Sequence, residues 1–166
     1  MRFARFLLLA AIVSVAAVFL PAAERALYPD PSLAKAQIAA ALKTAARTHK
    51  RVLLDFGGNW CGDCFVLDMY FHTPQNRPLL EHNYVVVYVN VGELDTNLDI
   101  ADRYQVPVRH GVPGVAVLSD TGKLLYSARN KELEYAVQHS DPAAVTRFLA
   151  QWKAGSKGCS VVAMDC

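Results

Sequence analysis

Two cysteines separated by two residues, Cys61 and Cys64, form the stretch of this chain best suited to chemistry. They follow a short apolar run at residues 52–56 and precede an amphipathic segment that extends to Phe71. This pattern predicts a strand, a tight turn and a helix, with Cys61 at the helix N-terminus. At that position, unpaired backbone N–H groups and the positive end of the helix dipole favour the thiolate. Cys64 lies one turn further on, close enough to attack a mixed disulfide formed at Cys61.

The cysteine pair alone is open to other interpretations, because such pairs also serve as static disulfides or as half of a zinc site. Zinc would require a second closely spaced pair, whereas Cys159 and Cys166 enclose six residues in a polar tail. We therefore predict a structural disulfide between Cys159 and Cys166, with a second redox relay as the alternative. No metal site is predicted.

Residues 1–23 have the layout of a secretory signal peptide. Arg2 and Arg5 give a basic start, an apolar run follows at residues 6–20, and small residues end the segment. The alternative is an uncleaved membrane anchor, since the uncharged residues 6–23 approach the roughly 20 that cross a bilayer. In either case the rest of the chain is expected in the periplasm or another extracytoplasmic compartment, where disulfides persist. Membrane contact is expected only if the segment stays uncleaved.

The leader holds two of the 17 basic residues and none of the 15 acidic ones, so the remaining chain is formally neutral. That balance provides no basic patch for nucleic acid. The residues after the leader are numerous enough for one domain with a normal core, whose folding does not depend on disulfides. The predicted organisation is a leader at 1–23, a domain at 24–153 and a cysteine-containing tail at 154–166.

Local patterns predict alternating helices and strands followed by a hairpin. The predicted helices are 33–49, 61–71, a short one at 75–82, 97–104 and 143–153, and the predicted strands are 52–56, 84–91, 115–119 and 124–127. The continuous β-branched run at 84–91 suggests a central strand covered on both faces. The early elements form a parallel βαβ unit and the last two strands are antiparallel. This order predicts an α/β fold with a central mixed β-sheet flanked by helices on both faces.

The strand at 52–56 followed by Trp60-Cys61-Gly62-Asp63-Cys64 resembles the active-site strand and turn of thioredoxin. Val112-Pro113, about fifty residues later and just before a predicted strand, resembles the cis-proline loop of that family. The resemblance covers roughly residues 33–152. Residues 68–90 are similar to exported thioredoxin-like domains, including the C-terminal domain of the DsbD reductase. The resemblance implies a thioredoxin-like fold, with a βαβ N-terminal half and a C-terminal half made of a β-hairpin and a helix.

The resemblance also implies roles for the matching residues. Cys61 would be the exposed nucleophile and Cys64 the buried resolving thiol. Trp60 would pack beside the thiols and shape the surface on which substrates dock. Asp55 matches the buried carboxylate of the family, which would accept the proton of Cys64 during resolution. A purely structural buried carboxylate is the alternative for Asp55.

The proline loop would contact the substrate. Pro113 would be cis and face the disulfide, and the backbone of Val112 would pair with an extended substrate segment. The chain departs from the family pattern at two positions near this loop and the carboxylate. Gly114 stands where a hydroxyl residue follows the proline, and Tyr88 or its neighbour stands where thioredoxin has the lysine that partners its carboxylate.

Asp63, inside the cysteine motif, is expected to tune the redox poise. A carboxylate beside the thiols opposes the thiolate and should raise the pKa of Cys61. A less stable thiolate makes the dithiol a better electron donor. This argument favours a reductase or isomerase over a strong oxidase.

Together these features predict an exported thiol–disulfide oxidoreductase that reduces or isomerises protein disulfides through a mixed-disulfide intermediate. Its partners would be the thiols and disulfides of exported client proteins, together with a redox protein that recycles the dithiol. The Cys61–Cys64 couple would need no cofactor. Two alternatives remain at this point: a non-catalytic thioredoxin-like binding module, and a metal-carrying or assembly factor that serves one client.

Overall fold

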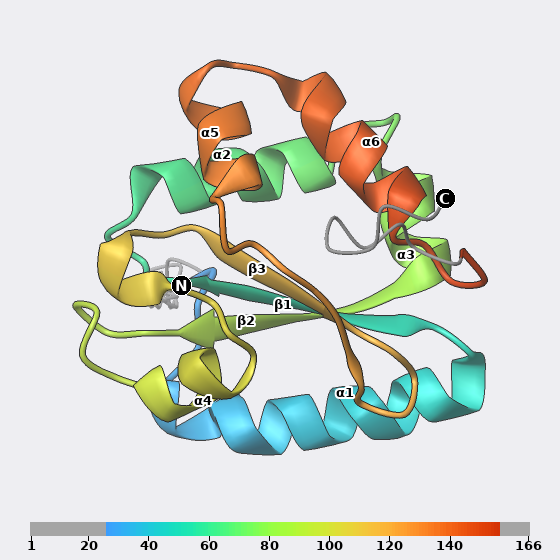
Figure 1. Cartoon of the computed structure of the whole chain (residues 1–166), viewed down its shortest axis with the longest axis horizontal. Helices are drawn as coiled ribbons and strands as arrows, with labels where there is room; N and C mark the ends of the chain where they lie inside the picture. The colour runs from blue at the N-terminus through green and yellow to red at the C-terminus, as the bar shows by residue number, and fades with distance from the viewer. Residues whose placement is uncertain (1–25, 157–166) are drawn as a thin grey trace, which may run out of the picture.

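A mixed four-stranded sheet forms the centre of the computed structural model, which describes residues 26–156 (Figure 1). Its strands are β1 (Arg51–Gly57), β2 (Tyr84–Asn90), β3 (Gly114–Leu118) and β4 (Leu124–Ser127). They are arranged in the order β2-β1-β3-β4. β1 is parallel to β2 and antiparallel to β3, and β3 and β4 form an antiparallel hairpin. The predicted mixed sheet, with a βαβ first half and a hairpin in the second half, is confirmed.

Helices cover both faces of this sheet, as predicted. They are α1 (Ala34–Thr48), α2 (Gly62–Phe71), α3 (Arg77–Asn83), α4 (Leu98–Arg103), α5 (Glu132–Gln138) and α6 (Pro142–Gln151), with short 3₁₀ turns η1 (Pro31–Leu33) and η2 (Val108–His110). α1 and α4 lie on one face, and α2, α3, α5 and α6 lie on the other (Figure 1). Among the described residues, no helix is both long enough and apolar enough to span a membrane.

The core is divided by the sheet into two apolar clusters, because successive residues of a strand point to opposite faces. Leu54 and Phe56 of β1 join the cluster beneath α1, whereas Leu53 joins the cluster beneath α2 and α6. All three side chains are completely buried. β1 is therefore fixed from both sides, and the turn that follows it is presented at one end of the sheet.

The prediction that residues 84–91 form a central strand is wrong. β2 occupies the edge of the described sheet and pairs with β1 alone. Its residues are apolar because helices lie over both faces of the strand: Val87 and Val89 pack in the cluster beneath α1, and Tyr84 packs in the other cluster. Burial of the two faces does not require a strand on each side, and this explains the error.

The helix α5, which precedes the last described helix, is not predicted from the sequence. It has only seven residues, follows a residue with positive φ (Lys131, φ 57°), and has no side-chain hydrogen bond capping its start. Its buried residues, Leu133, Ala136 and Val137, have helical spacing over little more than one turn. By contrast, α6 begins as predicted, with Pro142 in its first turn and the Asp141 carboxylate accepting the Ala144 N–H.

Candidate active site

A disulfide between Cys61 and Cys64 lies where β1 passes into α2. Cys61 is the N-cap of α2, and its Sγ accepts a hydrogen bond from the Cys64 N–H at 3.1 Å. The two Cα atoms are 5.3 Å apart. The predicted strand, turn and helix are therefore present, and the positive end of the α2 dipole points at the Cys61 sulfur. This position stabilises negative charge on Cys61 whenever the disulfide opens.

The two cysteines differ in accessibility, although less than expected. Cys64 is completely buried and Cys61 is 5% exposed. The expectation of an exposed Cys61 is thus corrected: it is the more accessible of the two, but it is largely buried. A thiolate from another protein would reach Cys61 before Cys64, because only Cys61 has any contact with solvent.

The loop that contacts Cys61 contains the expected cis peptide bond, between Val112 and Pro113. The Val112 carbonyl oxygen lies 3.9 Å from Cys61 Sγ, so the loop and the disulfide are in direct contact. Gly114 follows, and a Cβ at this position would lie 2.6 Å from a methyl group of Val106. The close approach of Val106 leaves no room for the side chain that the family pattern has after the proline.

Trp60 projects from the turn just before Cys61, and 48% of its surface is exposed. Its indole N–H donates a hydrogen bond to the Gly92 carbonyl at 2.6 Å. This bond fixes the ring beside the end of β2 while a large part of the ring remains accessible. The arrangement is suited to the predicted docking role, since an exposed, immobilised aromatic ring contacts a partner with little loss of conformational freedom.

Asp55 is completely buried in β1, six residues before Cys61. Burial raises the pKa of its carboxyl group to about 8, an effect that the hydrogen bond from Tyr28 opposes and the nearby charge of Asp68 reinforces. Its Oδ1 accepts that bond from the Tyr28 hydroxyl at 3.1 Å, and its Oδ2 has no hydrogen-bond partner within residues 26–156. A buried carboxyl group with one free oxygen and a pKa near neutrality is suited to proton transfer.

Tyr28 is the site residue that the sequence does not reveal. The resemblance places Tyr88 or its neighbour at the position of the lysine that partners the carboxylate in thioredoxin, but Tyr88 bonds to Asp68 instead. Tyr28 is 1% exposed, and it lies in a proline-rich turn with no periodicity that indicates burial. The only signal in the sequence is a single large aromatic residue within an otherwise polar turn, which is typical of a side chain that anchors the turn to the core.

Asp63 lies in the first turn of α2, between the two cysteines, and is partly exposed. A carboxylate in the first turn stabilises the helix, because it complements the helix dipole. The same carboxylate competes with a Cys61 thiolate for that positive potential. Its predicted effect on the redox poise remains a prediction.

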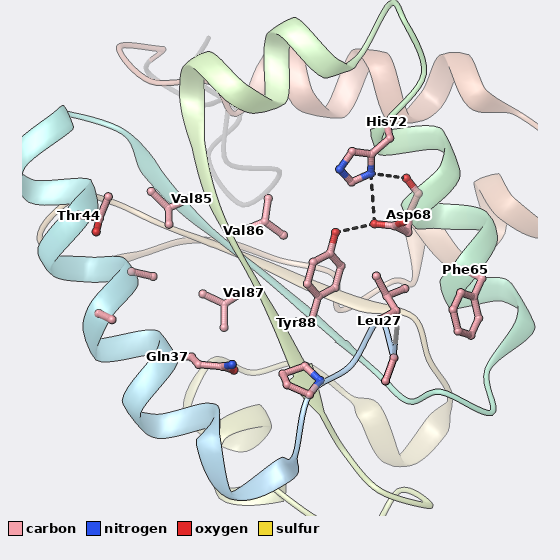
Figure 2. A pocket seen from close by; sticks show the side chains of 14 residues that line it. Leu27, Gln37, Thr44, Phe65, Asp68, His72, Val85, Val86, Val87 and Tyr88 are labelled. Carbon is pink, nitrogen blue, oxygen red and sulfur yellow. Dashed lines mark hydrogen bonds and ion pairs between the residues drawn. The ribbon is translucent and has the colours of Figure 1, made fainter. Parts of the chain in front are cut away.

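A groove of about 860 Å³ runs beside the edge strand β2, between α1 and α2 (Figure 2). Within it the Tyr88 hydroxyl donates to Asp68 at 2.5 Å, and the His72 ring nitrogen lies 3.2 Å from the same carboxylate (Figure 2). Neither cysteine lines this groove. It is therefore separate from the disulfide, although the side chain of Tyr88 meets that of Tyr28 edge to face at 5.7 Å.

Two predictions concern residues that the structure does not describe, and one concerns metal binding. Cys159 and Cys166, the predicted structural disulfide, lie outside residues 26–156, as does the leader at 1–23. Within the part of the chain that the structure describes, no group of three or more histidine, cysteine or acidic side chains is arranged to hold a metal ion.

Comparison with known proteins gives a family match and several similar structures. The model of the family described as Thioredoxin-like matches residues 34–119. A disulphide isomerase from Xylella fastidiosa Temecula1 is 34% identical, with a TM-score of 0.71, and the match covers 77% of this chain and 97% of that protein. Two further structures are more distant. A mutant thioredoxin from Halobacterium salinarum NRC-1 is 22% identical (TM-score 0.45; 68% of this chain and 82% of that chain), and the reduced DsbD C-terminal domain from Neisseria meningitidis is 24% identical (TM-score 0.44; 63% and 95%). No curated protein gives a significant match.

Proposed function

This chain belongs to the thioredoxin-like family, and from that premise we propose that it reduces or isomerises disulfide bonds in other proteins. Its C-x-x-C disulfide is consistent with a thiol–disulfide oxidoreductase. The observation that carries the proposal is the contact between the Cys61–Cys64 disulfide, at the start of α2, and the cis Val112–Pro113 loop. A static disulfide would need neither a helix dipole aimed at one sulfur nor a loop against it.

In the proposed reaction, the Cys61 thiolate attacks a client disulfide, forms a mixed disulfide with one client sulfur and releases the other as a thiolate. The Cys64 thiol then loses its proton and attacks Cys61 Sγ. This second step forms the Cys61–Cys64 disulfide and releases the remaining client sulfur as a thiolate. Asp55 is the buried base that receives the proton of Cys64. Trp60 and the backbone of Val112 would hold the client segment against Cys61.

The direction of electron flow is proposed from one comparison and from the position of Asp63. The similar Xylella protein is described as a disulphide isomerase. Asp63, in the first turn of α2, is expected to oppose the Cys61 thiolate and so to favour the reduced protein as an electron donor. A measured reduction potential of the Cys61–Cys64 couple near the roughly −120 mV of a strong oxidant would contradict this direction, whereas a value of about −180 mV or below would support it.

Trapping of the intermediate tests the proposed reaction. A Cys64→Ala variant retains the nucleophile and lacks the resolving thiol, so we expect covalent adducts with client proteins that dissolve in reductant. The wild-type protein should reduce insulin disulfides, and a Cys61→Ala variant should form no adducts and have no activity. A wild-type protein that is inactive and a Cys64→Ala variant that forms no adducts would instead indicate the non-catalytic binding module.

We also propose that the protein is exported, on the basis of the layout of residues 1–23. Expression of the full chain in a bacterium, followed by fractionation and intact-mass measurement, tests this proposal. Mature protein that begins at residue 23 or 24 in the periplasmic fraction is expected. Full-length protein in the membrane fraction would indicate the anchor, and full-length protein in the cytoplasm would exclude export.

A further inference from the structure

The Tyr28 hydroxyl bonds to the buried carboxylate and, like the buried Cys64 sulfur, closely approaches Gly57, and the proposed reaction does not use it. We propose that Tyr28 relays the proton between Cys64 and Asp55 when the Cys61–Cys64 disulfide opens and closes. The inference rests on the proposed function, because it assigns a further residue to that reaction.

Three buried groups lie near one another at the end of β1. Tyr28, Asp55 and Cys64 are all almost completely buried, so bulk water has little access to the proton that Cys64 must gain or lose. The Tyr28 hydroxyl donates to Asp55 Oδ1 at 3.1 Å. A Cβ added to Gly57 would lie 2.8 Å from Cys64 Sγ and still closer to the Tyr28 hydroxyl. The hydroxyl and the sulfur therefore both pack against the backbone of Gly57, an approach that is possible because residue 57 has no side chain.

Tyr28 is held in place through its backbone. Its backbone N–H donates to Asn59 Oδ1 at 2.9 Å, and its carbonyl accepts from Asn59 Nδ2 at 2.8 Å. The next carbonyl along the chain, that of Pro29, accepts from Asn90 Nδ2 at 2.9 Å. Asn59 is two residues before Cys61, so the cysteine turn itself positions the tyrosine. A residue that served only as a hydrophobic anchor would not need these backbone hydrogen bonds, which fix the position of the Tyr28 side chain.

The chemistry of the relay balances in both directions. When an incoming thiolate attacks Cys61 Sγ, the S–S bond breaks and its electron pair goes to Cys64 Sγ. The Tyr28 hydroxyl gives its proton to that sulfur and takes one from protonated Asp55, which becomes a carboxylate. When Cys64 later attacks the mixed disulfide, the same proton returns: Cys64 to Tyr28, and Tyr28 to Asp55. Tyr28 ends each step neutral, and no other proton donor is needed.

The acidities of the groups fit this sequence. Burial, reinforced by the nearby charge of Asp55, raises the pKa of Tyr28 well above its usual value, so the hydroxyl passes a proton without remaining ionised. The other titratable groups around Asp55 are Asp68 of α2, whose charge raises the Asp55 pKa, and Tyr88 of β2, whose pKa is raised by burial and by Asp68. His72 pairs with Asp68 on the groove side (Figure 2).

A Tyr28→Phe variant removes the hydroxyl and keeps the ring. The hydroxyl bond lowers the Asp55 pKa, so its loss should move the pH midpoint of the resolving step upward. We also expect resolution of a trapped mixed disulfide at pH 7 to slow by about a hundredfold, the lower end of the range for general acid–base catalysis. The initial attack by Cys61 should remain within about twofold of the wild-type rate, because its thiolate is stabilised by the helix and not by the relay.

Tyr88→Phe is the matched control, since it removes a hydroxyl bonded to Asp68 from a ring that touches Tyr28. It should leave the rates of the initial attack and of resolution within about twofold of the wild-type rates, and it should leave the pH midpoint of resolution unchanged. A Tyr28→Phe variant with the wild-type resolving rate and pH midpoint would overturn the relay, as would equal effects of the two substitutions. An inactive wild-type protein would instead contradict the proposed function itself.

Replacing Tyr28 with 3,5-difluorotyrosine tests the relay if Tyr28→Phe fails to fold, because it keeps the hydroxyl and nearly the same shape. The more acidic phenol donates a stronger hydrogen bond to Asp55, so the pH midpoint of resolution should move downward. An unchanged midpoint in this folded variant would also overturn the relay.

Discussion

Asp55 illustrates how a single residue serves the site at a cost to the fold. Its carboxyl group is completely buried, and its pKa of about 8 means that it is largely protonated at neutral pH. In that state it can supply a proton to Cys64, and as a carboxylate it can take the proton back. The sequence predicted Asp55 from its spacing to Cys61, through the family resemblance. It did not predict Tyr28, because the hydrogen bond joins residues 27 positions apart and leaves no local pattern.

The raised pKa of Asp55 predicts a specific dependence of stability on pH. Between the ordinary value of about 4 and the folded value of about 8, the folded protein binds a proton that the unfolded chain has lost. The unfolding free energy of the wild type should therefore fall as pH rises through this window, and level off above it. Asp55→Asn removes the titrating group, so it should stabilise the protein at pH 9 by about 5 kcal/mol.

Urea unfolding of both disulfide-bonded proteins at pH 5, 7 and 9 measures this difference. The gap between Asp55→Asn and wild type should widen with pH. A gap that is constant from pH 5 to 9 would show that the carboxyl group is not protonated in the folded protein.

At the scale of elements, the turn between β1 and α2 was predictable because its signals are local. Cys61 caps α2, and the buried run of β1 precedes it within a few residues. The place of β2 in the sheet was not predictable in this way, because pairing depends on residues distant in the chain and an apolar run looks the same at an edge or in the centre. The short helix α5 lacked both length and a cap. Local sequence thus predicted the elements that carry the cysteines better than the arrangement around them.

Gly57 at the end of β1 provides a test of how tightly these elements meet. In Gly57→Ala, the new methyl group would lie 2.8 Å from Cys64 Sγ and closer still to the Tyr28 hydroxyl. Overpacking of a filled site costs about 1–3 kcal/mol, so we expect a loss of about 2 kcal/mol in urea unfolding. Gly62→Ala is the control, since a Cβ there meets nothing within 4 Å and alanine favours the first turn of α2. It should be neutral or stabilising by up to about 0.5 kcal/mol. Equal losses in the two variants would refute the tight contact.

At the scale of the whole molecule, the first described residues of the chain form part of the site, because three asparagine side chains attach them to later segments. Asn59 binds both backbone groups of Tyr28, Asn90 binds the Pro29 carbonyl, and Asn97 binds the Pro31 carbonyl. Asparagine offers a donor and an acceptor on one side chain, so it can replace the two bonds of a strand pair. The segment thereby closes over Asp55 without joining the sheet. A turn of proline and polar residues gives no indication of such a role in the sequence.

The two hydrogen bonds from the Asn59 side chain to the Tyr28 backbone can be removed by one substitution. Asn59→Ala removes two hydrogen bonds at about 1 kcal/mol each, so the unfolding free energy should fall by about 2 kcal/mol. Release of Tyr28 removes a hydrogen bond that lowers the Asp55 pKa, but it should also admit water to Asp55. Because burial is the larger of the two effects, solvation of the carboxylate should lower its pKa from about 8 by at least about one unit. Titration of the Asp55 carboxyl carbon by NMR measures this shift. Asn83→Ala is the matched control, because the Asn83 side chain bonds within its own helix, to the Leu79 carbonyl. It should cost about 1 kcal/mol and leave the Asp55 pKa unchanged. An unchanged Asp55 pKa in Asn59→Ala would mean that packing alone holds Tyr28 over the carboxylate.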